Sequence, residues 1–200
     1  AEARVVGFVD RADLYETPER SYVRVVDYKT GQKKFSYSDV LHGMGMQMLL
    51  YLFALEEHGA LLWGRAPQPA GVLYVPARAQ ILPLKARPNG EYAAAEREKE
   101  MRRSGLLLDD ARVLEAMERT EDGTTHFLPC KPDKDGELRG YLASPEQLAL
   151  LRRHVWRTME RIADEIAGGN LRPNPYFQGS EQGACRFCQF APVCHLDSCE

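Results

Sequence analysis

The sequence has 200 residues, of which 44% are hydrophobic and 28% are charged. This length and composition suit one globular domain, or one domain with an appendage, that buries a core of its own. No run approaches the roughly 20 apolar residues that a membrane span needs, and the N-terminal sequence lacks the order of a secretory signal, so we expect a cytoplasmic protein without a membrane partner. The net charge of -3 argues against a wholly basic nucleic-acid coat but allows a local positive channel.

The N-terminal region predicts a β-hairpin. Residues 4–15 alternate between two sets of side chains, which is typical of a strand. Residues 21–29 are rich in β-branched and aromatic side chains, and the turn-like segment Thr17–Arg20 separates the two runs. The turn therefore fixes which residues of the two strands face each other.

Centring this turn between residues 18 and 19 places charged residues opposite one another. Asp13 then faces Arg24 as an ordinary cross-strand charge pair, whereas Asp10 faces Asp27. Two opposed carboxylates destabilise a hairpin unless a cation lies between them. We therefore expect a divalent metal ion at this pair.

Asp27, Tyr28 and Lys29 form a D-x-K tripeptide. Because strand side chains alternate, Asp27 and Lys29 share a face, while Tyr28 points away and offers its backbone carbonyl as a further ligand. Two carboxylates, a carbonyl and waters suit Mg²⁺ or Mn²⁺, and Lys29 could position an attacking water or stabilise charge on phosphorus. This set predicts phosphodiester hydrolysis. A D-x-K tripeptide alone usually marks no more than a strand end, and the opposed Asp10 is what favours the metal site.

Residues 38–58 are long and apolar and follow the capping residues Ser36 and Ser38, so we predict one mostly buried helix. Gly43 and Gly45 weaken this helix, each by about 1 kcal/mol relative to alanine. A close approach of another backbone would explain why these glycines are tolerated.

The following segments complete a mixed α/β core. Residues 71–75 predict a core strand, and residues 79–85 a possible continuation of the sheet. The charged segment 87–134 predicts a peripheral insertion, with a polar helix at 93–103 and a second helix after Asp110.

Ser144 to Gln147 form a capping motif with a proline at the first helical position, which predicts a helix that runs to about Ala167. The chain thus divides into four predicted parts: a core with the hairpin and the apolar helix at 1–84, a peripheral insertion at 85–140, a C-terminal core helix at 141–170 and an extended tail at 171–200.

Gln47 and Tyr51 lie four residues apart and share one face of the predicted apolar helix, where both could reach a substrate or a catalytic carboxylate. Taken alone, such a pair is more often a satisfied polar group of the core. The aromatic residues Phe35, Tyr37 and Trp63 could stack on unpaired bases, although core packing is the commoner role.

Four of the five cysteines lie in the last sixteen residues, at Cys185, Cys188, Cys194 and Cys199, while Cys130 stands apart. In a cytoplasmic chain this spacing favours a metal or cluster site over disulfides, and Zn²⁺ and an iron–sulfur cluster both remain open. The plainer interpretation is a set of reduced surface cysteines. His195 beside Cys194 is more often a solvent-exposed residue than a ligand.

Several of these motifs together resemble a known family. Gly7 to Arg11, Asp27 to Lys29 and Gln47 to Tyr51 resemble the G-x-x-D-R, D-x-K and Q-x-x-x-Y motifs of the RecB-type branch of the PD-(D/E)XK nucleases. The cysteine tail is similar to the C-terminal cysteine triplet of the AddB family, one of the two kinds of chain in bacterial AddAB helicase-nucleases.

The resemblance implies a restriction-endonuclease-like mixed sheet flanked by helices, with a cysteine-rich tail. It implies a metal-dependent DNA exonuclease domain of a complex that resects double-strand DNA ends for recombinational repair. Its active-site residues would be Asp10, Asp27, Lys29, Gln47 and Tyr51. Its partners would be single strands of unwound DNA, the AddA helicase-nuclease subunit and the rest of an AddB chain.

The same resemblance implies a 4Fe-4S cluster held by Cys185, Cys188 and Cys194 with a fourth, upstream cysteine. That cysteine and the family's upstream helix, which carries a further active-site residue, are absent from these 200 residues, so we expect both sites to be completed outside them. Cys199 is an alternative fourth ligand. The competing hypotheses are an inactive DNA-binding or partner-binding module of the same fold and a small zinc-binding interaction domain.

Overall fold

The structure is a computed structural model that describes residues 2–31, 33–78, 90–118, 125–177, 185 and 188–194. The chain forms two compact units. The larger unit comprises residues 4–157, and the smaller comprises Thr158–Glu200 with Ala1–Ala3. The boundary falls within one long helix.

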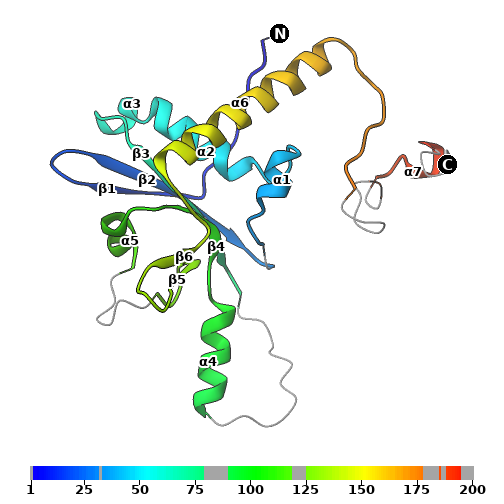
Figure 1. The fold of residues 1–200 in the computed structure, drawn as a ribbon. Coiled ribbons are helices and arrows are strands. Elements are labelled where there is room, and N and C mark those ends of the chain that lie inside the picture. The colour runs from blue at the N-terminus through cyan, green and yellow to red at the C-terminus, as the bar shows by residue number, and fades with distance from the viewer. Residues whose placement is uncertain are drawn as a thin grey trace. The chain divides into compact units, whose positions relative to one another are not determined.

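A five-stranded mixed sheet forms the centre of the larger unit (Figure 1). The strands lie in the order β1 (Arg11–Glu16), β2 (Ser21–Lys29), β3 (Gln68–Pro76), β4 (Ser104–Leu108) and β7 (Leu142–Ala143). β1 pairs antiparallel with β2, β2 parallel with β3, β3 antiparallel with β4, and β4 parallel with β7. The expected mixed α/β fold is confirmed.

The predicted hairpin and its register are confirmed. Asp13 pairs with Arg24, and Arg24 Nε lies 2.8 Å from Asp13 Oδ2. Arg11 Nε lies 2.6 Å from the other oxygen of the same carboxylate. Burial opposes ionisation of Asp13, but hydrogen bonds from Arg11 and Arg24 outweigh it and lower the pKa of Asp13. Thr17 N–H closes the turn by donating to the Arg20 carbonyl oxygen at 2.8 Å.

The first strand is shorter than predicted. β1 begins at Arg11, and residues 2–9 belong to no strand. Val6 and Phe8 are 72% and 89% exposed. An alternating sequence forms a strand only where it can pair with a neighbouring strand and bury one face in a core. In the described part of the chain, the side chains of Val6 and Phe8 pack against no core.

β2 is the central strand on which the rest of the sheet is built. Val23 and Val25 are completely buried, and Val26 is 3% exposed, so both faces of β2 are covered. The β2–β3 register shifts by one residue between Val23 and Arg24, which is the mark of a β-bulge. The extra residue is Ala70 of β3, and from Gly71 onward β3 pairs continuously with the C-terminal half of β2.

The prediction of a single helix over residues 38–58 is wrong. The structure instead has α1 (Tyr37–Leu41), α2 (Gln47–His58) and α3 (Ala60–Trp63). Gly43 and Gly45 adopt φ values of 82° and 63°, a left-handed conformation that ends one helix before the next begins. The predicted cap is present, since Ser36 Oγ accepts a hydrogen bond from Asp39 N–H at 3.1 Å.

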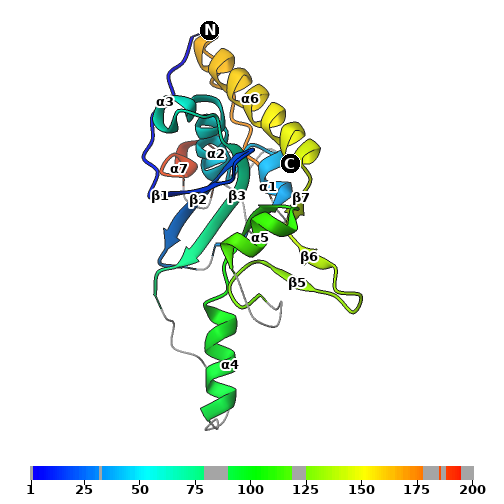
Figure 2. The same ribbon diagram turned by 90° about the vertical axis from the view of Figure 1, so that its left-hand side faces the viewer.

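α2 supplies the core on one face of the sheet, where it contacts β2 and β3 (Figure 2). Its buried residues are Met48, Leu49, Leu52 and Phe53. The other face carries a second core cluster made of Val26, Leu73, Leu107, Leu114, Leu128 and Cys130. The sheet is therefore covered on both sides.

The segment expected to be a peripheral insertion contains α4 (Gly90–Glu100), α5 (Ala111–Met117) and the hairpin of β5 (Cys130–Pro132) and β6 (Leu138–Gly140). α4 projects away from the sheet in both views (Figures 1 and 2). The segment also contains β4, however, whose Leu106 and Leu107 are completely buried. Residues 104–108 are thus core rather than periphery, and the predicted continuation of the sheet at residues 79–85 lies outside the described residues.

The predicted capped helix is confirmed as α6 (Pro145–Ala167). Gln147 N–H donates to Ser144 Oγ at 3.3 Å, and Ser144 N–H donates to Gln147 Oε1 at 2.8 Å. The smaller unit also contains α7 (Ala191–Cys194). Within the described residues, no helix combines the length and the apolar character that crossing a membrane requires.

Candidate active site

Asp27 and Lys29 lie at the C-terminal end of β2. Lys29 Nζ is 2.6 Å from Asp27 Oδ2, so the two side chains share a face as the alternation predicted. Asp27 is 9% exposed, and within the described residues Lys29 is the ion-pair partner of its carboxylate. The Lys29 ammonium balances the charge of Oδ2, and a carboxylate oxygen has a second lone pair for another ligand. Such an oxygen is a natural donor to a cation.

The next strand makes the surroundings of Asp27 less polar. Asp27 pairs with Tyr74 of β3, which is 6% exposed. Burial and the neighbouring Asp27 carboxylate raise the pKa of Tyr74 to about 12. The phenol thus stays neutral near neutral pH, and charges at Asp27 interact in a partly desolvated environment where electrostatic forces are stronger than in water.

Asp10 reaches the same end of the hairpin from the segment before β1. Strand pairing stops at Arg11 and Val26, one position short of the predicted Asp10–Asp27 pair. Asp10 Oδ2 instead accepts a hydrogen bond from Tyr28 N–H at 3.4 Å. The Tyr28 ring points away and is 45% exposed, and its hydroxyl accepts a hydrogen bond from Arg11 at 3.1 Å. The structure therefore brings Asp10 to the backbone of the D-x-K tripeptide.

Gln47 and Tyr51 lie in the first turns of α2 and contact each other. Gln47 Nε2 donates to Tyr51 Oη at 3.0 Å. The N-terminal segment passes directly over this pair, because a Cβ atom built on Gly7 would lie 2.6 Å from Tyr51 Oη. Gly7 thus contacts α2 while Asp10 contacts β2. The segment that carries the G-x-x-D-R motif therefore contacts both the D-x-K motif and the Q-x-x-x-Y motif.

The donor set is compatible with a hard divalent cation. In the described ranges, no three His, Cys, Asp or Glu side chains gather closely enough to hold a metal by themselves. Asp10, Asp27 and the Tyr28 carbonyl are candidate ligands, and water would fill the other positions. Mg²⁺ and Mn²⁺ accept such a partly hydrated site, whereas Zn²⁺ prefers three or four protein ligands.

The cysteines of the tail lie in a turn followed by one short helix. Cys188 N–H donates to the Cys185 carbonyl at 3.1 Å, and Cys194 ends α7. The thiols of Cys188 and Cys194 are exposed and outside any disulfide. The other predicted tail residues, Cys199 and His195, lie outside the described residues.

Cys130 has a different role. Its side chain is 2% exposed and belongs to the core cluster with Val26 and Leu73. Burial raises the pKa of its thiol. Cys130 is therefore a core residue of the larger unit.

The sequence patterns did not predict one feature that lies beside Lys29. An open pocket of about 500 Å³ is lined by Lys29, by residues 33–35, by residues 99–104 and by parts of the β5–β6 hairpin. We call it the basic pocket because of its lining side chains: Lys29, Lys33, Lys34, Lys99, Arg102, Arg103, Lys131 and Arg139. The adjacent pairs Lys33-Lys34 and Arg102-Arg103 were the available sequence signal.

Comparisons with known proteins identify the family of the chain. A family model described as the PD-(D/E)XK nuclease superfamily matches residues 2–195. The B subunit of an ATP-dependent helicase/deoxyribonuclease from Thermoanaerobacter sp. (strain X514) is 33% identical over 199 residues, which are 98% of this chain and 17% of the relative. The protein of the same name from Acetivibrio thermocellus is 36% identical over 200 residues, 97% of this chain and 17% of the relative.

A third relative of the same name, from Geobacillus kaustophilus, is 36% identical over 198 residues, 96% of this chain and 17% of the relative. The chain thus spans about a sixth of the length of these curated relatives. The likeness to AddB that the motifs indicated is confirmed.

Replacing Gly7 should disturb the Gln47–Tyr51 pair. In Gly7→Ala the new methyl group would lie 2.6 Å from Tyr51 Oη, so the tyrosine must move and its hydrogen bond from Gln47 breaks. We expect a shift of the Gln47 side-chain amide resonances and a decrease of about 1 kcal/mol in the free energy of unfolding. Gly31→Ala is the control, because nothing lies within 4 Å of its added Cβ. Unmoved Gln47 resonances in Gly7→Ala would contradict the described contact.

Proposed function

The chain belongs to the PD-(D/E)XK nuclease superfamily, and we propose that it is the metal-dependent DNA-cleaving domain of a bacterial helicase-nuclease. The observation that carries this proposal is the buried Asp27 carboxylate at the end of the central strand, with the Lys29 ammonium 2.6 Å from it. Asp10 approaches the same tripeptide from a separate segment.

Each side chain then has a role in phosphodiester hydrolysis. Asp10, Asp27 and the Tyr28 carbonyl would hold Mg²⁺ or Mn²⁺, which when bound supplies a polarised phosphoryl oxygen and a more acidic water. The Lys29 ammonium has three donors, so it can donate to Asp27 and to an oxygen of the substrate phosphate together. Gln47 and Tyr51 orient each other at the start of α2, from where they position the strand or an active-site carboxylate.

The proposed substrate and partners follow the relatives. Three of them are named as the B subunit of an ATP-dependent helicase/deoxyribonuclease. We therefore propose that this domain is part of an AddB chain, that it works with an AddA helicase-nuclease subunit, and that it cuts one of the unwound strands as an exonuclease. In that role it would resect double-strand DNA ends for recombinational repair.

Cleavage of single-stranded DNA tests this function. The protein as its gene encodes it should degrade an end-labelled strand with Mg²⁺ or Mn²⁺ and lose this activity with EDTA. Asp27→Ala and Lys29→Ala should each slow cleavage at least about 100-fold, because each removes a group that stabilises the transition state. Glu19→Gln, an exposed carboxylate of the hairpin turn, should cut normally.

Equal cleavage by Asp27→Ala would refute the proposed site. An intact protein that binds DNA but cuts no strand with either metal would favour an inactive binding module instead.

We also propose that Cys185, Cys188 and Cys194 supply three thiolates of a 4Fe-4S cluster. The three residues lie within ten positions of one another in the sequence, and the thiols of Cys188 and Cys194 are exposed. The described structure does not gather the three thiols at one point, so cluster binding would have to draw them together. Such a cluster takes four thiolates, so a fourth ligand must come from Cys199 or from a cysteine outside these residues.

Metal analysis tests the cluster. Protein purified without oxygen should contain iron and acid-labile sulfide, and Cys188→Ser should lose both. Cys130→Ala should retain both, because Cys130 belongs to the core of the other unit. Zinc in place of iron, or full iron content in Cys188→Ser, would rule the cluster out.

A further inference from the structure

The basic pocket combines a high positive charge with a position next to Lys29. Eight lysine or arginine side chains line it, against a single lining carboxylate, Glu100. The whole chain has a net charge of -3, so this positive charge is concentrated locally. A pocket of this kind attracts a polyanion, and phosphates are the polyanionic groups that the proposed reaction brings to Lys29.

Much of this charge is not neutralised by the protein. Lys99 pairs with Glu96, and Arg139 pairs with Asp133 and Glu137. Within the described ranges, four other lining cations form no ion pair: Lys33, Lys34, Arg103 and Lys131.

Arg103 is partly buried and held in a defined position among these cations. Burial, followed by the positive charge of Arg24, lowers the pKa of Arg103. The Arg103 guanidinium also lies 5.6 Å from the centre of the Phe127 ring, a cation–π contact that holds it in place. A phosphate at Arg103 would therefore meet a cation that is already held in place.

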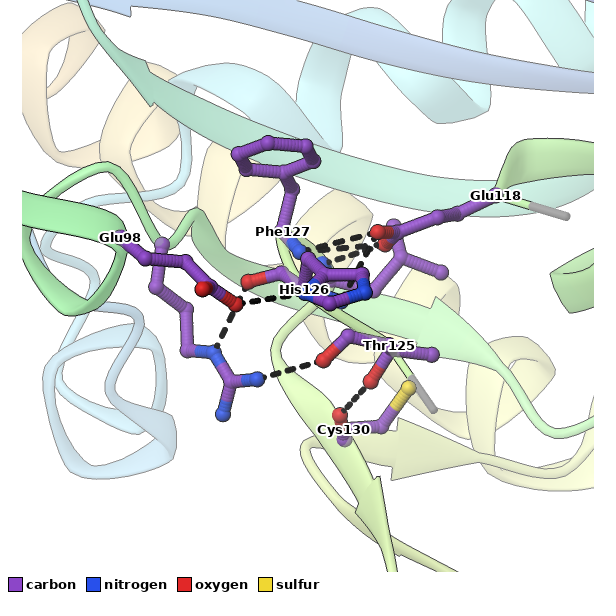
Figure 3. A network of polar contacts seen from close by, with 8 residues as sticks. Glu98, Glu118, Thr125, His126, Phe127 and Cys130 are labelled. Carbon is purple, nitrogen blue, oxygen red and sulfur yellow. Dashed lines mark hydrogen bonds and ion pairs between the residues drawn. The ribbon is translucent and has the colours of Figure 1, made fainter. Parts of the chain in front are cut away.

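A network of hydrogen bonds holds the segment that leads into the lining residues Pro129, Cys130 and Lys131 (Figure 3). The Glu118 carboxylate accepts hydrogen bonds from three successive backbone N–H groups, those of His126, Phe127 and Leu128, at 2.8 to 3.2 Å. His126 Nδ1 also lies 2.6 Å from Glu98 Oε1 of α4. The network thus ties α4 and α5 to the segment that precedes β5.

This fixed segment in turn positions both arginines. Arg102 Nη2 donates to the Thr125 carbonyl at 2.6 Å, and Arg103 N–H donates to the Phe127 carbonyl at 2.9 Å. The two cations are therefore held on a prepared scaffold, which reduces the entropy cost of ligand binding.

Aromatic rings border the pocket on the side of α1. Phe35, Tyr37 and Tyr141 form a cluster with ring centres 5.1 to 6.0 Å apart. Phe35 is 4% exposed, but Tyr37 and Tyr141 are 46% and 44% exposed. Exposed rings beside a positive groove are the usual platform on which unpaired bases stack. In a duplex the faces of the bases are covered by their neighbours, so they cannot stack on protein rings.

We propose that the basic pocket binds unpaired DNA next to the cleaved phosphodiester, with phosphates at Lys34 and Arg103 and a base stacked on Tyr141. The pocket has the volume of sites that enclose a ligand of nucleotide size, which span about 300–1,000 Å³. This assignment rests on the proposed nuclease function for its place in the reaction. It gives a binding site to the single strand that the proposed function names. It also gives the segment predicted to be a peripheral insertion a direct part in holding that strand.

Equilibrium binding of a fluorescent oligothymidylate to the chain in EDTA tests this assignment without any cleavage. The double variant Lys34→Gln and Arg103→Gln should weaken binding at least about tenfold. The slope of log affinity against log salt should fall by about 0.7 for each phosphate that the variant no longer neutralises. Arg153→Glu is the matched control, since it changes the charge of an exposed arginine on α6 outside the pocket.

Tyr141→Leu separates stacking from charge. It keeps an apolar side chain at this position but removes the ring, so we expect about fivefold weaker binding or more with an unchanged salt slope. A duplex of the same length should bind more weakly than the single strand. Tighter duplex binding, or an equal weakening in the double variant and in Arg153→Glu, would overturn the assignment.

The outcomes also distinguish this assignment from the nuclease function. If no cleavage is found but the pocket variants still bind the single strand more weakly, the nuclease function fails and the pocket stands. If the protein cuts DNA while the pocket variants bind and cut like the wild type, the pocket assignment fails alone.

Discussion

The burial of one carboxylate, Asp27, constrains the whole of the proposed site. β2 is covered on both faces, and near its end Asp27 is 9% exposed beside the largely buried Tyr74. Removing a charge from water costs several kcal/mol unless partners compensate for it. Lys29 supplies such a partner at 2.6 Å. The proposed site uses the same pair of side chains to bind a cation and a phosphate.

The segment before β1 shows how sequence spacing becomes geometry. It forms no strand, yet Gly7 lies against Tyr51 and Asp10 meets the backbone of Tyr28. These two contacts come from residues three positions apart along the chain. The three-residue spacing of the G-x-x-D motif thus lets one segment contact α2 through Gly7 and the end of β2 through Asp10. A larger side chain at Gly7 would displace Tyr51.

Turn and capping motifs, which consist of neighbouring residues, correctly predicted the elements that depend on them. The turn at Thr17 to Arg20 fixed the hairpin register, and the Ser144 capping motif located the start of α6. The break between α1 and α2 was missed, because a glycine such as Gly43 tolerates a helix and the left-handed conformation alike and tertiary packing decides between them. β4 was missed because a short apolar run carries no periodicity.

The basic pocket as a whole could not have been predicted from spacing, although the pairs Lys33-Lys34 and Arg102-Arg103 indicated part of it. Its cations come from the end of β2 and the segment after it, from the end of α4 and the segment before β4, and from the β5–β6 hairpin. Only the sheet order, which places β4 next to β3, brings these separate segments to the end of β2. Asp10, Asp27 and Lys29, in contrast, come from one hairpin and its entry segment, so pattern and register were enough to indicate them.

The most direct test of the central claim is calorimetric titration of Mn²⁺ into the chain without DNA. If Asp27 and Asp10 hold the metal, the wild type should bind Mn²⁺, and Asp27→Asn and Asp10→Asn should each weaken binding at least about tenfold, because each variant removes a charged oxygen ligand. Asp27→Asn that binds Mn²⁺ with unchanged affinity would contradict the metal site at the end of β2.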